Sequence, residues 1–222
     1  CLSNHVAIGA SVVREKVLVQ HQTALFADFA YALPLTETDN LYLGIKAGGN
    51  LFNIDSSRFK TYNDQYDPYL QGVSGRFQPN VGVGAYYQQP RFYVGLSAPN
   101  LLASDKTKVE NEVVTSVAER ISFYAQAGYF YPLTADFTLS PRAQAYINQK
   151  GDYQLNASAA VLYSDYVEAA LGYRSDSAVN ICALFKVPKY HLSIGYGFET
   201  NVDNNVGASV RNFHEFMLKV YW

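Results

Sequence analysis

Few side chains in this sequence could carry out acid–base or nucleophilic chemistry. Ser193 follows His191 by two residues, so the two could share one face of a strand. A serine–histidine pair needs an acid that orients the histidine and an oxyanion hole before it can transfer acyl groups. The sequence indicates neither, so we predict no enzyme activity, with a phospholipase or acyltransferase as the alternative. The other histidines are His5, His21 and His214.

Charged residues recur at positions where they share a strand face with polar neighbours. Such a set could form an ion-pair network that fills the interior of the fold, or it could line a selective pore. We favour the filled interior. The candidate network consists of Arg120, Arg142, Glu168, Arg174, Lys186, Glu215 and Lys219.

No metal or cofactor site is indicated. Asp64 and Asp67 lie in a tyrosine-rich loop, where we expect them to be solvated. Cys1 and Cys182 make neither a set of metal ligands nor a disulfide framework. The net charge of −2 is too small to indicate a nucleic-acid partner.

The elements that must position these side chains are β-strands. Apolar residues occupy every second position nearly throughout, which predicts about twelve strands of roughly 9–12 residues, the length of a tilted membrane strand. No apolar run approaches the roughly 18 residues of a membrane helix. The alternating segments cover 6–12, 25–33, 41–47, 81–87, 92–98, 121–131, 137–147, 153–163, 167–173, 179–185, 190–198 and 216–222.

Two folds alternate in this way, a soluble sandwich with its apolar face inside and a membrane barrel with its apolar face outside. Tyrosines at or near strand ends on the apolar face favour the barrel, because a belt at the lipid headgroups requires that placement. We predict an all-β, antiparallel transmembrane β-barrel that forms one outer-membrane domain over residues 1–222. The tyrosines are Tyr129, Tyr131, Tyr153, Tyr163, Tyr173, Tyr190 and Tyr196.

The lengths of the connections give this barrel an orientation. The three longest, 55–79, 100–119 and 199–210, fall on the same side, which we assign as external together with 14–21, 148–152 and 175–178. Candidate external contact residues are Tyr62, Tyr66, Tyr69, Asn201 and Asn204. The short turns 34–40, 89–90, 133–136, 164–165 and 188–189 are then periplasmic.

The last strand also looks like the closing strand of a bacterial outer-membrane barrel. It would close the barrel with Phe216, Leu218, Val220 and Trp222 on one face and place the C-terminus in the periplasm.

Several segments, taken in order, resemble the PorP/SprF family of the type IX secretion system of Bacteroidetes. The resemblance spans essentially the whole chain, and its ending keeps the His214-Glu215 pair but lacks the glycine and serine that usually precede it. The segments are Leu41–Gly48, Pro79–Tyr87, Phe92–Leu102, Tyr124–Leu133, Leu171–Ser175 and Arg211–Phe216.

This resemblance implies a barrel of about fourteen strands, so we expect the N-terminal part of the family barrel to be missing here. It also implies a non-enzymatic component of protein secretion and gliding that sits in outer-membrane lipid. Such a component would bind or anchor secreted cargo with C-terminal sorting domains, and would dock periplasmic ring or peptidoglycan-linked subunits. The alternative is a porin or channel for small solutes or hydrophobic molecules.

Overall fold

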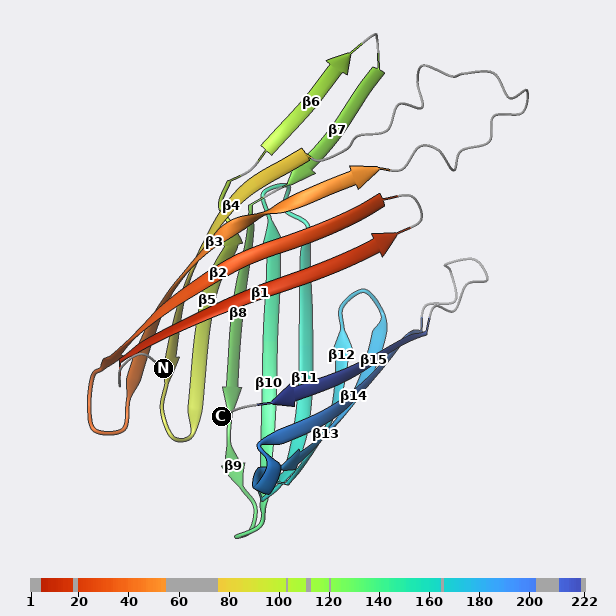
Figure 1. Ribbon diagram of the computed structural model, residues 1–222. Helices are drawn as coiled ribbons and strands as arrows, with labels where there is room; N and C mark the ends of the chain where they lie inside the picture. Colours follow the sequence, from red (N-terminus) through yellow and green to blue (C-terminus); the bar gives the residue numbers. More distant parts are fainter. Residues whose placement is uncertain are drawn as a thin grey trace. The chain divides into compact units, whose positions relative to one another are not determined.

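The computed structural model describes residues 5–17, 20–54, 76–102, 104–110, 113–119, 121–164, 166–202 and 212–220. These residues form antiparallel β-structure with one short 3₁₀ helix, η3 (Pro188–Tyr190) (Figure 1). Among them, no helix has the length and apolar character needed to cross a membrane. The predicted all-β class is therefore confirmed.

Twelve strands follow one another in a 13-stranded sheet, in the order β1-β2-β3-β4-β5-β8-β10-β11-β12-β13-β14-β15, and the short β9 pairs with β10. The twelve strands of this order agree in number with the strands predicted from the sequence. The order runs from β1 to β15, and no pairing between those two strands is present among the described residues, so the structure does not show the predicted closure into a barrel. Closure is not determined by the alternation of side chains, which is the same in an open and a closed sheet.

The chain divides into two compact units. Unit 1 consists of residues 1–35, 40–85 and 97–123, and unit 2 of 36–39, 86–96 and 124–222. Strands β1 (Val6–Val17), β2 (Gln20–Pro34) and β3 (Asn40–Ile54) lie in unit 1, with most of β4 (Arg76–Gln88) and the hairpin of β6 (Ser104–Glu110) and β7 (Val113–Glu119). Strand β5 (Phe92–Asn100) is divided between the units.

Unit 2 holds most of β8 (Ser122–Tyr129) and all of the later strands. These are β9 (Tyr131–Pro132), β10 (Phe137–Asn148), β11 (Tyr153–Tyr163), β12 (Val167–Arg174), β13 (Ala178–Val187), β14 (Leu192–Asn201) and β15 (Phe213–Val220).

In both units the polarity of the sheet is the reverse of that of a soluble protein. Large apolar side chains are exposed, for example Leu25 and Ile45 in unit 1 and Leu155 and Leu171 in unit 2. We call the side that carries them the exposed face. The alternate side chains form the covered face, whose most buried polar members are Asn50, Gln78, Asn80, Ser122, Ser140 and Ser193.

Aromatic side chains bound the exposed face of β11. Tyr153 and Tyr163 are 70% and 45% exposed and lie at its two ends. Their separation along the strand projects to about 25 Å at about 3.3 Å per residue and a tilt of about 40°. That is the height of the apolar band of an outer-membrane barrel.

Glycines in unit 1 allow unusually close approach of backbones. A Cβ on Gly48 would lie 2.1 Å from the carbonyl oxygen of Leu25 and 2.7 Å from Cα of Phe26. A Cβ on Gly82 would lie 2.6 Å from the carbonyl oxygen of Pro99. No larger residue fits at either position without movement of the backbone.

Several expected boundaries differ from the structure, and three of the differences have a clear physical reason. The predicted loop 14–21 is mostly strand, because β1 and β2 pair up to Val17 and Gln20. The predicted loop 100–119 contains the β6–β7 hairpin, which is rich in the β-branched residues that favour strands. Tyr190 belongs to η3 and not to a strand, because Pro188 starts a helical turn there.

Candidate functional site

An ion pair on the covered face of unit 2 links two strands that are not neighbours. Arg142 on β10 donates a hydrogen bond from Nη1 to Oε1 of Glu168 on β12, at 2.6 Å. Strand β11 lies between them and contributes Ala160, which is fully buried opposite Ser140 and Ala170. Arg142 Nε also donates to Ser140 Oγ at 3.1 Å. The small residues on β11 and β10 leave the space through which the arginine reaches.

A second ion pair repeats this arrangement two strands further along. Arg174 on β12 donates from Nη1 to Oε2 of Glu199 on β14, at 2.8 Å, across β13. The residue of β13 opposite Arg174 is Ala178, also fully buried. We call the two contacts the alternate-strand ion pairs, and together they connect β10, β12 and β14.

The second ion pair continues into the turn after β12. Arg174 Nε donates to Oδ1 of Asp176 at 2.7 Å, and Gln154 Nε2 donates to its Oδ2 at 3.2 Å. The hydrogen bond from Arg174, and then its positive charge, lower the pKa of the Asp176 carboxyl below its ordinary value, against the opposite effect of partial burial.

The structure brings together only part of the predicted charge network. Arg142 and Glu168 pair with each other, and Arg174 pairs with two acids that were not in the set. Lys186, Glu215 and Lys219 form no ion pair within the described residues, and Arg120 lies outside them. Whether the set fills an interior stays a prediction.

The network predicted from the sequence did not include Glu199 and Asp176, for two different reasons. Glu199 lies on the same face as Ser193 and would have been found by extending the alternation of β14 past Phe198. Asp176 belongs to a turn, where alternation carries no information about neighbours.

The remaining covered face offers little for catalysis. His191 adopts a left-handed conformation (φ 52°) in the turn after η3, before β14 begins, whereas Ser193 is buried in β14. His191 and Ser193 therefore do not share one face of a strand. No group of three or more metal-ligating side chains occurs in the described part of the chain. The described cysteine, Cys182, is a free exposed thiol.

Aromatic side chains also lie on the covered face, although the sequence pattern indicated polar and charged residues there. In unit 2 the rings of Tyr86 and Tyr93 have centroids 5.5 Å apart, and Tyr93 and Phe130 have centroids 6.0 Å apart. Tyr93 covers Gly128, where a Cβ would lie 2.5 Å from its ring. These rings therefore fill part of the covered face of unit 2.

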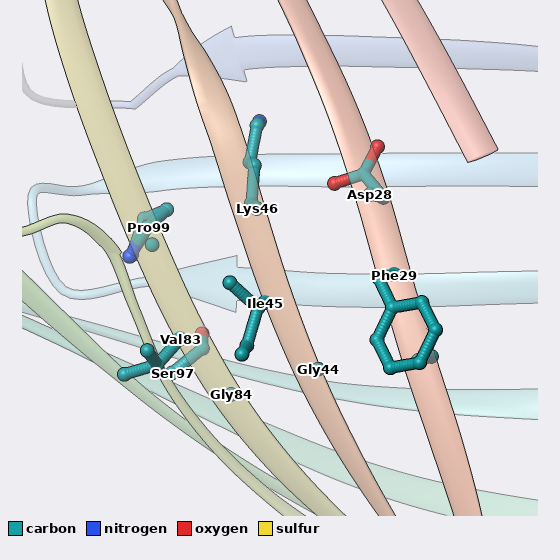
Figure 2. A pocket seen from close by; sticks show the side chains of 11 residues that line it. Asp28, Phe29, Gly44, Ile45, Lys46, Val83, Gly84, Ser97 and Pro99 are labelled. Carbon is teal, nitrogen blue, oxygen red and sulfur yellow. The ribbon is translucent and has the colours of Figure 1, made fainter. Parts of the chain in front are cut away.

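Unit 1 contains a hollow of about 240 Å³ (Figure 2). Its lining includes Gly44 and Gly84, which have no side chains, together with Asp28 and Lys46, which are paired across β2 and β3. Lys46 Nζ lies 4.2 Å from the centroid of the Phe26 ring, so this cation contacts an aromatic face. No ion pair of Asp28 or Lys46 is present among the described residues.

The predicted last strand exists as β15, and its role in closing a barrel stays a prediction. Phe216, Leu218 and Val220 lie opposite Tyr196, Ile194 and Leu192 of β14 and are largely exposed. Of the candidate contact residues, Asn201 is the exposed last residue of β14. Tyr62, Tyr66, Tyr69, Asn204 and Trp222 lie outside the described residues.

An antiparallel sheet with exposed apolar side chains and covered polar ones has the polarity of a β-sheet membrane protein. Residues 2–220 match the family described as Type IX secretion system membrane protein PorP/SprF, and the chain belongs to this family. The resemblance found in the sequence is thereby confirmed. No curated protein and no solved structure matched the chain.

Proposed function

We propose that the chain forms an outer-membrane β-barrel whose exposed face contacts lipid and whose covered face lines the interior. The observation that carries this proposal is the reversed polarity of the sheet: Ser140 and Asn80 are at most 1% exposed, whereas Leu218 is 70% exposed. Only a closed barrel satisfies the backbone hydrogen bonds of such a sheet in lipid. The C-terminus is then periplasmic, on the side of the short connections.

Arginine substitutions on the two faces of one hairpin test the lipid contact. Ala157 lies near the middle of β11 on the exposed face, and Gln144 lies on the covered face of β10. In lipid vesicles we expect Ala157→Arg to lower the free energy of unfolding by about 2–4 kcal/mol, as arginine does at the bilayer midplane. Gln144→Arg should change it by less than about 0.5 kcal/mol. Equal effects of the two substitutions would contradict the assignment of faces.

We further propose a non-enzymatic role in type IX secretion, in which the barrel binds or anchors secreted cargo with C-terminal sorting domains and docks periplasmic subunits. Membership of the PorP/SprF family supports this role. The test is surface retention of a reporter fused to a sorting domain, in cells with and without this protein. Retention should be lost without it, and unchanged retention would overturn the role.

A porin is the competing function. The alternate-strand ion pairs and the aromatic rings of the covered face favour a filled interior over an open one. We therefore expect the purified full-length protein to give no stable conductance in a planar bilayer. A stable open channel would favour the porin.

A further inference from the structure

Two lysines on the covered face of unit 2 differ from its arginines. Lys186 of β13 and Lys219 of β15 both lie opposite Ser193 of β14, so the three side chains form one row across three strands. Side chains directly opposite one another are separated by about 4.5–5.5 Å at Cβ, so the two lysines start about 10 Å apart. Arg142 and Arg174 each bind a carboxylate, whereas neither lysine has an ion pair within the described residues.

The surroundings of this row make it a candidate anion site. Glu168 lies on β12 opposite Leu184, one row from Lys186, but its carboxylate is bound by Arg142 at 2.6 Å. Ser193, 4% exposed between the lysines, adds a hydroxyl group that can donate a hydrogen bond. The row therefore places two ammonium groups on one face, on either side of the covered Ser193 hydroxyl group.

An apolar surface adjoins the row. Leu184 and Met217 lie on either side of Gly195, and a Cβ on this glycine would lie 3.3 Å from Leu184 Cδ1 and 3.1 Å from Met217 Cε. The two apolar side chains therefore converge over the glycine. A carboxylate bound by the row would therefore lie beside an apolar surface.

We propose that Lys186, Ser193 and Lys219 bind an acidic segment of a partner protein. The row lies near the end of β13 that leads into η3, and near the end of β15. The proposal rests on the proposed function, which places these short connections in the periplasm and so makes the partner a periplasmic subunit. A protein carboxylate is favoured over a lipid phosphate, because the lysines project from the covered face and not from the apolar exposed face.

The test measures binding of a fluorescent hexaglutamate peptide to the full-length protein in phosphatidylcholine nanodiscs. We expect the double variant Lys186→Gln/Lys219→Gln to raise the Kd roughly tenfold and to lower the dependence of Kd on salt. Lys186→Arg/Lys219→Arg should retain binding, because it keeps both charges. The matched control Lys16→Gln/Lys150→Gln removes two exposed lysines elsewhere and should leave the Kd unchanged.

Three outcomes would overturn the proposal: unchanged binding by the Lys186/Lys219 glutamine variant, equal loss in the control variant, or loss of binding to phosphatidylglycerol vesicles with unchanged peptide binding. The first result would show that the two lysines do not bind the peptide. The second would show that the loss of binding follows from the change in net charge alone. The third would identify a lipid phosphate as the ligand. Heat-dependent gel mobility confirms that each variant is folded. Cargo retention is measured separately, so failure of this site leaves the proposed function standing if retention still depends on the protein.

Discussion

Units 1 and 2 stabilise the same kind of sheet in different ways. Unit 1 has long strands, 15 residues each in β2 and β3, and relies on backbones that approach closely at Gly48 and Gly82. Unit 2 has shorter strands, such as 8 residues in β12, and joins alternate strands through charged side chains. A single-layer sheet has no second layer to pack against, so its covered face must be filled by its own backbone or by its own polar groups.

The polar groups of the covered face follow the same division. In unit 1, Asn80 is 1% exposed and its Oδ1 accepts hydrogen bonds from the backbone N–H of Val81 and Leu102 at 2.8 and 3.3 Å. On the covered face of unit 2, Arg142 and Arg174 instead donate to the side chains of Ser140, Glu168 and Glu199. We therefore expect unit 1 to respond to changes of shape and unit 2 to changes of charge.

The largest expected effect is that of a methyl group at Gly48. Gly48→Ala places a Cβ against the backbone of β2, so we expect a loss of about 3 kcal/mol in the free energy of unfolding, measured by urea titration in lipid vesicles. The matched control is Gly197→Ala in unit 2, where the added Cβ would lie 3.7 Å from Cβ of Glu215. If both variants lose the same stability, close backbone approach does not distinguish the units.

Removing one partner of the first alternate-strand ion pair should have the next largest effect. Glu168→Gln leaves Arg142 without its carboxylate at a site where the two side chains are 29% and 18% exposed. We expect a loss of about 2 kcal/mol and faster hydrogen exchange in β10 and β12 than in β2 and β3. Glu37→Gln in the exposed β2–β3 turn is the control and should be neutral. Hydrogen exchange that becomes faster by the same factor in both units would contradict the proposed difference between unit 1 and unit 2.

Asn80→Ala tests the amide of unit 1. The substitution removes the acceptor for two backbone N–H groups in a buried position, so we expect a loss of about 1.5 kcal/mol. The faster exchange should be confined to the residues next to β4 and the end of β5. Asn201→Ala, at the exposed end of β14, should have no measurable effect on unfolding.

The smallest effect is a pH dependence confined to unit 2. Because the pKa of Asp176 is lowered in the folded state from its ordinary 3.8, its contribution to stability is present above that value and is lost as the pH falls through the folded pKa. Asp176 is about half exposed, so the contribution is small. When the pH is lowered from about 6 to about 3, the free energy of unfolding of the Asp176→Asn variant should fall less than that of the unchanged protein. An equal loss would show that other carboxyl groups account for the acid sensitivity.

The sequence predicts the exposed face well and the contacts of the covered face poorly. Leu25, Leu155 and Ile194 were placed correctly because side chains on the exposed face follow the pleat of the strand and need no specific partner. Arg142 and Glu168 were assigned to one face, but their pairing depends on how far an arginine reaches over Ala160. Alternation within one strand contains no information about such reach.

The errors in boundaries have a common physical cause. The β1–β2 hairpin keeps its pairing through Arg14, Lys16 and His21, where both faces are polar and the alternation of apolar residues has ended. Backbone hydrogen bonds extend a strand beyond the point where its side chains change character. A polar segment is therefore not evidence for a loop at the end of a membrane strand.

The alternate-strand ion pairs also impose an order on assembly. The β10–β11 hairpin can form by itself, but Arg142 meets Glu168 only when β12 has paired with β11. Likewise, Glu199 meets Arg174 only after β13 has brought β14 into place. Arg142 therefore has no carboxylate partner until β12 arrives, whereas Arg174 already binds Asp176 in the turn after its own strand and gains Glu199 only when β14 joins the sheet.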